Sequence, residues 1–218
     1  MVLVTISHRM LRSERLFQAV AFPYELVTRH PVWERDCARM ASELPPGCRR
    51  VLDLGCGPGN SATHLRDAVP AVLAVDYAPA MLRRARKRDP RLLLVRGDAR
   101  GLPLRDGSVD AVLCWDIFDF LAPRAAEVLA GKLTRMLRPE GLLLGFFGAR
   151  AADDPRYTKY FIEDTAHLRH RFYPSACTRR WVLQNRDINH LFAGLELFDS
   201  VLLKSGVREI LFRKRVPS

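Results

Sequence analysis

The chain has 218 residues, of which 48% are hydrophobic, and it carries a formal net charge of +11. This length suits one α/β domain, and no apolar run is long enough to span a bilayer as a helix. The five cysteines are odd in number and include no C-x-x-C pair. That pattern argues against a disulfide framework and a zinc site and indicates a reducing, cytoplasmic compartment.

Residues 1–45 form an extension that precedes the first predicted strand. Arg9, Arg12 and Arg15 are accompanied there by a single nearby acid, Glu14. Transit peptides share this arginine-rich composition, but no secretory apolar core with a cleavage site follows. We favour helices that lie over a ligand pocket as a lid. The sequence leaves open whether the extension is also a targeting segment.

Residues 51–60 read VLDLGCGPGN and predict a buried strand, a glycine-rich turn and the start of a helix. Glycines after a strand allow a tight turn and a close approach to a ligand. We expect Asn60 or Ser61 to cap the helix, whose first N–H groups attract negative charge. The sequence therefore predicts a nucleotide-type site at the carboxyl end of this strand.

The spacing of the glycines separates two kinds of nucleotide. A dinucleotide fingerprint places its third glycine three positions after the second. Here Gly59 follows Gly57 by only two positions. Asp53 also stands near the strand end, where it would repel a pyrophosphate and attract a sulfonium ligand that carries an ammonium group. The motif therefore favours a sulfonium nucleotide over NAD.

Two further strands are predicted at residues 71–75 and 92–95. Asp76 ends the first of them, where an acid can accept hydrogen bonds from two ribose hydroxyls. A helix opens at Pro79, which the first turn of a helix tolerates. Its basic run at residues 83–88 is interpreted as a solvated face rather than a patch for nucleic acid or an anionic membrane.

The next segments continue the alternation of strands and helices. A strand is predicted at residues 109–113, a helix at residues 123–137 and a fifth strand at residues 142–147. Residues 148–195 are long for a connection and rich in aromatic side chains, as expected of a segment that carries specificity. Two last strands are predicted at residues 197–203 and 207–212.

The sequence pattern of residues 51–147 resembles that of the class I S-adenosylmethionine-dependent methyltransferases. The shared motifs are the glycine turn, Gly97-Asp98-Ala99, the Leu-Pro-Leu at residues 102–104, the acids around Ser108 and the Leu-Arg-Pro-x-Gly at residues 137–141. Tyr24-Glu25 and the Phe-Tyr-Pro-Ser at residues 172–175 resemble the quinone-biosynthesis, or type 11, small-molecule group. That group has Tyr-Asp where this chain has Tyr24-Glu25.

The resemblance implies an α/β fold with a doubly wound, seven-stranded sheet that is mostly parallel and has an antiparallel last strand. It divides the chain into an N-terminal helical extension or lid at residues 1–45 and a methyltransferase domain at residues 46–218. A substrate-side insertion is expected at about residues 148–195.

The resemblance also implies a site for S-adenosylmethionine and its product S-adenosylhomocysteine. Asp76 matches the acid that binds the ribose, and Asp98 matches the acid that holds the adenine amino group. Cys56 is interpreted as a small side chain that fits the turn rather than a nucleophile. Tyr24 either lines the cofactor or is a packing aromatic. The implied cofactor residues are Tyr24, Asp53, Gly55, Cys56, Gly57, Gly59, Asp76, Tyr77, Met81, Asp98, Ala99, Cys114 and Trp115.

The implied activity is methyl transfer to O, N or C of a small-molecule acceptor. Residues 114–120 read CWDIFDF and lack both the D/N-P-P-aromatic and the Pro-Cys motif of base-modifying enzymes, which disfavours a flipped base. Two alternatives stay open: an RNA or protein methyltransferase, supported only by the net charge, and a non-catalytic S-adenosylmethionine-binding protein. We expect a monomer or a homodimer.

The candidates for a general base are His167, His170 and Asp116. The two histidines are three residues apart and could share one helix face. No further metal ligands accompany them, so no metal site is predicted. Asp119 either forms a polar pair with Asp116 or has a capping or solvent-facing role.

Overall fold

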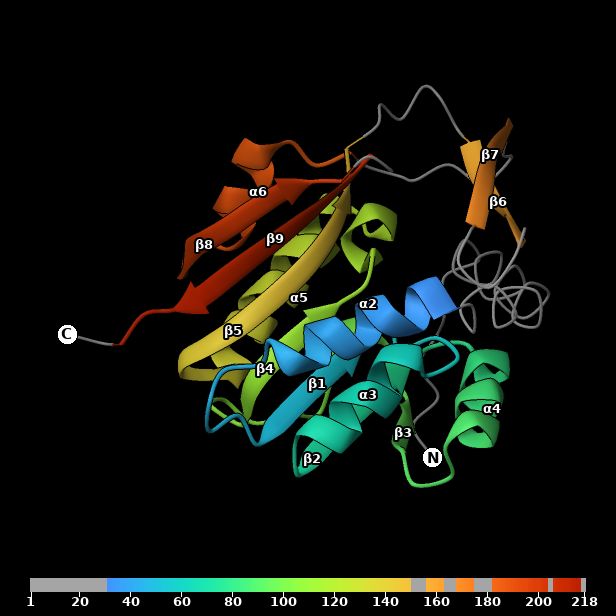
Figure 1. Cartoon of the computed structure of the whole chain (residues 1–218). Coiled ribbons are helices and arrows are strands. Elements are labelled where there is room, and N and C mark those ends of the chain that lie inside the picture. The colour runs from blue at the N-terminus through green and yellow to red at the C-terminus, as the bar shows by residue number, and fades with distance from the viewer. Residues whose placement is uncertain (1–30, 150–155, 163–167, 175–181, 204–205, 217–218) are drawn as a thin grey trace.

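The computed structural model describes residues 31–149, 156–162, 168–174, 182–203 and 206–216. In these ranges the strands form a seven-stranded sheet in the order β3-β2-β1-β4-β5-β9-β8 and a separate two-stranded sheet, β6-β7 (Figure 1). The strands are β1 Arg50–Leu54, β2 Ala71–Asp76, β3 Leu93–Arg96, β4 Val109–Cys114, β5 Leu137–Gly148, β6 Arg156–Ile162, β7 Leu168–Pro174, β8 Leu195–Leu202 and β9 Val207–Lys214.

The large sheet has the predicted mostly parallel architecture. Strands β1 to β5 pair in parallel, and β9 pairs antiparallel with both β5 and β8. The last strand is therefore the antiparallel one, as the resemblance implied. The chain order reverses between β1 and β4, and ligands of open α/β sheets bind outside the carboxyl ends of the strands at such a switch point.

Helices cover both faces of the sheet (Figure 1). One face packs against α2 Pro31–Ser42, α3 Asn60–Ala68 and α4 Pro79–Arg88, and the other packs against α5 Pro123–Met136 and α6 Asn185–Leu191. Side chains of a strand alternate between the two faces. In β1, Leu52 and Leu54 accordingly join the α5 side and Val51 joins the α3 side.

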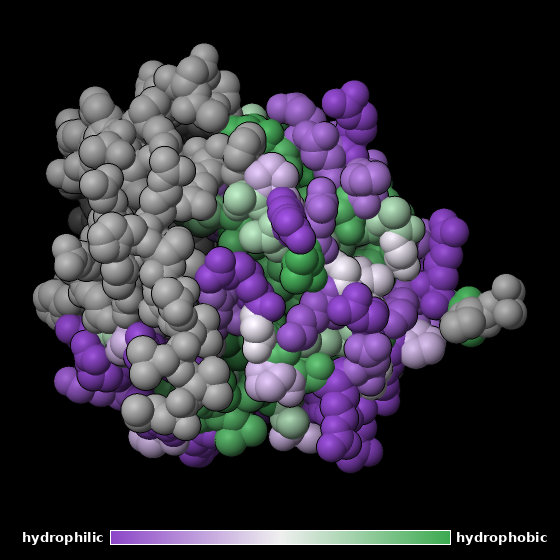
Figure 2. Space-filling view, turned by 180° about the vertical axis from the view of Figure 1, so that it is seen from behind, coloured by the Kyte–Doolittle hydropathy of each residue, from purple (hydrophilic) through white to green (hydrophobic). Residues whose placement is uncertain are grey.

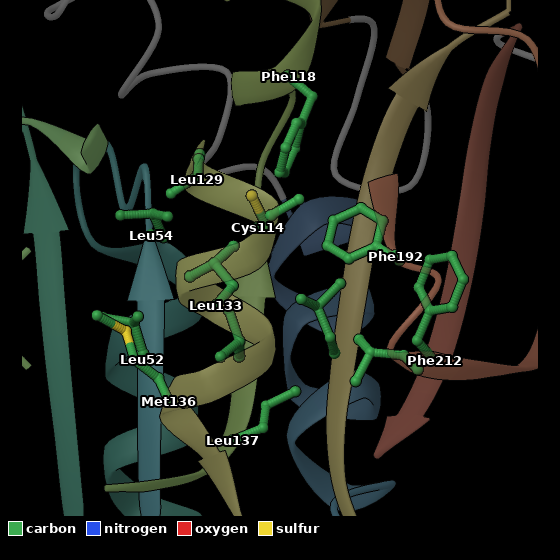
Figure 3. Close-up of a cluster of buried hydrophobic side chains, with 14 of the residues drawn as sticks. Leu52, Leu54, Cys114, Phe118, Leu129, Leu133, Met136, Leu137, Phe192 and Phe212 are labelled. Atoms are coloured by element: carbon green, nitrogen blue, oxygen red, sulfur yellow. The ribbon is translucent and has the colours of Figure 1, made fainter. Parts of the chain in front are cut away.

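The core on the α5 side follows from the helical spacing of the apolar residues in α5 (Figure 3). Leu129, Leu133 and Met136 are spaced by four and three residues, so they share one buried stripe. Phe192, just after α6, packs on Phe212 of β9 with ring centroids 4.9 Å apart. This contact holds the end of α6 against β9 of the sheet.

The start of α3 differs from the sequence prediction. The N-cap is Gly59, with φ 84°, and no side chain caps the helix, so the predicted cap at Asn60 or Ser61 is wrong. Ser61 lies inside the helix, where its hydroxyl donates to Oδ2 of Asp53 at 2.7 Å. The left-handed backbone that suits Gly59 thus moves the cap one residue earlier than the polar residues suggested.

The long connection after β5 contains the hairpin of β6 and β7. His170 lies in β7 opposite Tyr160 of β6, so the predicted helix face shared with His167 is wrong. His167 itself lies outside the described residues.

The face of the molecule formed by α5 and α6 is mostly hydrophilic where it is described, with apolar side chains in smaller areas between polar ones (Figure 2). Within the described ranges, no helix combines the length and the apolar character that a membrane crossing requires.

Candidate cofactor site

The glycine turn follows β1, leads into α3 and is hydrogen-bonded to the end of β2. Gly55, Gly57 and Gly59 all have positive φ, at 80°, 53° and 84°. The N–H of Gly55 donates to the carbonyl of Val75 at 2.8 Å. The N–H of Gly57 donates to Oδ2 of Asp76 at 2.8 Å. The turn is therefore held against the end of β2. A residue other than glycine at any of these three positions would strain the backbone.

Gly59 has a packing role. A Cβ atom at this position would lie 2.9 Å from Cβ of Ala85 in α4 and 3.1 Å from Cδ1 of Leu92. The absence of a side chain lets α3 and α4 approach closely. Gly59 therefore has a structural role in addition to the cofactor contact that the resemblance implied.

Asp53 is fully buried at the base of the turn. Its two oxygens accept hydrogen bonds from Ser61 Oγ at 2.7 Å and from Trp115 Nε1 at 3.1 Å. Burial raises the pKa of Asp53 to about 7, although these two hydrogen bonds act in the opposite direction. Because Asp53 has no exposed surface in this conformation, it can influence a ligand electrostatically but does not contact one. Its direct task is to hold Trp115 against the turn.

Asp76 presents a carboxylate at the carboxyl end of β2. Besides the N–H of Gly57, it accepts the N–H of Ala78 on Oδ1 at 2.8 Å. Burial raises the pKa of Asp76, and the hydrogen bonds from Ala78 and Gly57 oppose that shift. The backbone of Tyr77 also hydrogen-bonds to this carboxylate, and since a carboxylate has about four acceptor sites, capacity for a hydroxyl donor remains.

Asp98 follows β3 and is paired with a neighbour that the sequence analysis did not single out. Arg100 donates from its backbone N–H at 3.0 Å and from Nε at 2.9 Å to Oδ1 of Asp98. Burial works to raise the pKa of Asp98, but the bonds from Arg100 outweigh it, and the pKa lies below its usual value. Asp98 is therefore a firmly ionised acceptor next to a guanidinium.

The remaining implied cofactor residues fall into two groups. Tyr77, Ala99 and Trp115 are half-buried, whereas Cys56, Met81 and Cys114 are buried. Cys114 belongs to the core on the α5 side (Figure 3). Trp115 stacks on Phe146 of β5, with ring centroids 4.5 Å apart and planes 5° apart. That stack forms a rigid apolar wall after β4.

Asp116 and Asp119 lie just after β4 but have different surroundings. Asp116 is half-buried and has φ 39°, a left-handed backbone that costs free energy in a non-glycine residue. Asp119 is completely buried and accepts the N–H of Gly148 on Oδ2 at 2.9 Å. The solvent-facing alternative for Asp119 is therefore wrong.

Three proposed residues cannot be placed in the site. Tyr24 and His167 lie outside the described residues, and only the backbone of His170 is described. Of the candidates for a general base, only Asp116 has a described side chain. It stands at the carboxyl end of β4, beside the switch point of the sheet.

Two further charged residues, to which the sequence analysis gave no role, hold elements of the fold together; one is half-buried and the other is buried. Glu34 of α2 bonds to α3 and α4, and Arg208 of β9 is only 8% exposed. The signal for Arg208 lies in the alternation of β9, where it shares a buried row with Ile210 and Phe212. An arginine in an apolar row needs buried acceptors, which one sequence does not identify.

Comparisons with known proteins agree with this geometry. A family described as the methyltransferase domain matches residues 51–141. An uncharacterized methyltransferase of Mycobacterium bovis is 41% identical over 100 residues, which are 46% of this chain and 40% of that protein. The demethylmenaquinone methyltransferase of Thermus thermophilus is 33% identical over 141 residues, 59% of this chain and 62% of that protein. The chain thus spans between two fifths and two thirds of the length of these relatives.

Solved structures share the fold over nearly the whole chain. CalS10, an amino pentose methyltransferase of Micromonospora echinaspora solved with S-adenosylmethionine, has a TM-score of 0.63 at 20% identity and covers 98% of this chain and 99% of its own. A toxoflavin-precursor N1-methyltransferase of Burkholderia thailandensis has a TM-score of 0.63 at 18% identity, covering 99% of this chain and 93% of its own. Residues 51–141 of the chain thus match the methyltransferase-domain family, and the glycine turn and the strand order of the structure agree with that match.

Proposed function

We propose that the chain transfers the methyl group of S-adenosylmethionine to a small-molecule acceptor, at O, N or C. The observation that supports this most is the pair of carboxylates at neighbouring strand ends. Asp76 pairs with Arg96 in the β2–β3 register, and Asp98 follows two residues later. Two ionisable acceptors beside a glycine turn suit the ribose and the adenine of this cofactor better than a pyrophosphate.

The residues fit the cofactor in number and chemistry. Asp76 would accept from the ribose hydroxyls, and Asp98 would accept from the adenine amino group. The bound cofactor supplies a methyl group on a sulfonium that is already activated for in-line displacement. The chain's own task is then to align the acceptor at about 3–3.5 Å and to exclude water. The stacked pair Trp115 and Phe146 is suited to exclude water beside the turn.

An acceptor that loses a proton also needs a base. We propose Asp116, His167 and His170 for this role. Asp116 is favoured by its strained backbone at the end of β4, since such strain clusters at functional sites.

We also propose that residues 1–45 act as a lid and that the insertion at about residues 148–195 carries acceptor specificity. We further propose that the protein works in the cytoplasm as a monomer or homodimer. Cys48, Cys56 and Cys114 are free thiols, which suits a reducing compartment.

Calorimetry and an acceptor screen test the proposal. We expect S-adenosylmethionine and S-adenosylhomocysteine to bind in the micromolar range and NAD not to bind. The screen measures release of S-adenosylhomocysteine with phenols, quinols, amines and amino sugars, and with total RNA as the competing class. A preference for NAD contradicts the cofactor assignment. Turnover with RNA alone contradicts the small-molecule class, and binding without any turnover favours the non-catalytic alternative.

A further inference from the structure

Arg208 of β9 binds both ends of the chain segment that leaves and re-enters the large sheet. Its Nη2 donates to the carbonyl of Gly148, the last residue of β5, at 3.0 Å and also to the carbonyl of Leu183. Its Nη1 donates to Oδ1 of Asn185, the first residue of α6, at 2.6 Å. One guanidinium thus contacts the residues on either side of residues 149–182.

A buried carboxylate, that of Asp119, lies at the same junction as the guanidinium of Arg208. Asp119, which follows β4, accepts the N–H of Gly148 at 2.9 Å, so Gly148 is bonded through both its N–H and its carbonyl. Desolvation lowers the pKa of Arg208, while the charges of Asp119 and Asp187 act to raise it. A buried arginine is costly unless its donors are used and an opposite charge is near. Here both Nη atoms of Arg208 donate and Asp119 supplies a nearby carboxylate, whereas the buried Nε has no partner among the described residues.

A hollow of about 480 Å³ lies next to this junction, between the start of α5 and α6. Leu183 lines the hollow and also receives the hydrogen bond of Arg208, so the guanidinium fixes the backbone of one wall. Leu121 and Pro123, which follow the carboxyl end of β4, line the opposite side. The hollow has an apolar lining with a polar rim that includes Glu127, Arg186, Asp187 and His190.

We infer that Arg208 is a positioning residue that fixes the two ends of residues 149–182 and, with them, the acceptor side of the enzyme. The statement that this side of the protein binds the acceptor rests on the proposed function. The tethering of the two segment ends by Arg208 does not. Arginine suits the task because its planar fork donates in several directions at once. Lysine would keep the charge and lose the simultaneous contacts.

The test compares Arg208→Met and Arg208→Lys with Arg213→Met as the matched control. Arg213 lies in the same strand on the opposite face, and its side chain is 36% exposed. We expect backbone hydrogen exchange in peptides covering residues 145–149 and 182–188 to be about tenfold faster in Arg208→Met, with a smaller effect in Arg208→Lys. Exchange in residues 51–60 and the affinity for S-adenosylhomocysteine should stay within twofold, and Arg213→Met should match the wild type.

Kinetics provide a second readout once the screen has found an acceptor. In Arg208→Lys, the KM for the acceptor should rise about tenfold, while the KM for S-adenosylmethionine stays within twofold. Uniformly faster exchange in all peptides, or unchanged exchange at residues 145–149 and 182–188, overturns the inference. If Arg208→Met does not fold, Asn185→Ala removes only the Nη1 acceptor and must change the same peptides. Failure of the wild type to bind S-adenosylhomocysteine contradicts the proposed function and leaves the exchange test of Arg208 valid.

Discussion

The backbone N–H of Gly57 donates to Oδ2 of Asp76, so the acid that ends β2 is bonded to the turn that ends β1. The same carboxylate holds the N–H of Ala78 at the approach to α4. One side chain thus fixes the turn and the next helix while it keeps acceptor sites for a ligand.

Asp76→Ala should weaken binding of S-adenosylhomocysteine about tenfold to a hundredfold. The reason is the loss of hydrogen bonds to a charged group, which cost about 1.5–3 kcal/mol. Calorimetry measures the affinity, and thermal unfolding checks that the turn survives the loss of the Gly57 bond. The matched control is Asp106→Ala, because Asp106 is exposed and makes only a long contact with Arg135. An unchanged dissociation constant in a folded Asp76→Ala would remove this acid from the site.

Asp53→Asn should change the pH dependence of stability. The folded pKa of Asp53 is about 7, and the unfolded value is about 3.9. Between these values the folded state holds the proton more tightly, so the group's contribution to stability is full at low pH and declines as the pH rises. The slope is up to about 1.4 kcal/mol per pH unit.

The asparagine variant removes that titration and keeps the shape of the side chain. The free energy of unfolding of the wild type, minus that of Asp53→Asn, should therefore fall between pH 5 and pH 7 and level off above. Urea unfolding at four pH values measures the difference. Parallel curves for the two proteins would show that Asp53 is ionised in the folded state at all these pH values.

Gly59→Ala should destabilise the protein by about 2–5 kcal/mol. Its left-handed backbone costs a side chain about 1–2 kcal/mol, and the contact with Ala85 adds overpacking of about 1–3 kcal/mol. Gly107→Ala separates the two terms, because Gly107 has φ 62° and nothing lies within 4 Å of its added Cβ. Equal losses from Gly59→Ala and Gly107→Ala, measured by urea unfolding, would exclude a packing role for Gly59.

Glu34→Ala should detach α2 from the helices that it covers. Oε1 of Glu34 accepts from Arg88 at 2.7 Å and from Asn60 at 3.2 Å, and Oε2 lies 2.7 Å from Nε2 of His64. Because the side chain of Arg88 is only 10% exposed, loss of its acceptor should cost about 1.5–3 kcal/mol.

The control for Glu34 is Glu43→Ala, which breaks the exposed pair with Arg39 and should cost under about 0.5 kcal/mol. The free energy of unfolding and proteolysis near residue 31 are measured for both variants. Equal effects of the two substitutions would contradict a special role for Glu34.

The local sequence predicted most of the sheet and the candidate cofactor residues. Apolar runs bounded by glycine or acid predicted β1, β2 and β4, because a buried parallel strand is short and continuous in its hydrophobicity. A similar run predicted β3, which lies at the edge of the sheet and is mostly exposed. The position of Asp76 at a strand end followed from the same pattern. These features depend on residues that are adjacent in the chain, so their spacing carries the information.

Tertiary structure decided the features that join distant segments. The close approach of α3 to Ala85 leaves no room for a side chain at Gly59, and the buried Asp53 is bonded to Trp115, which follows β4. The place of His170 in a strand depends on its pairing with β6.

Arg208 illustrates the same limit most clearly. The chain alone shows an arginine in an alternating strand, and only the fold brings the carbonyls of Gly148 and Leu183 to its guanidinium. A buried charge is stable only with partners, and its partners here lie 25 and 60 residues away along the chain. Sequence patterns therefore determined the elements and the glycine motif of this chain, whereas long-range packing decided which polar groups its interior retains.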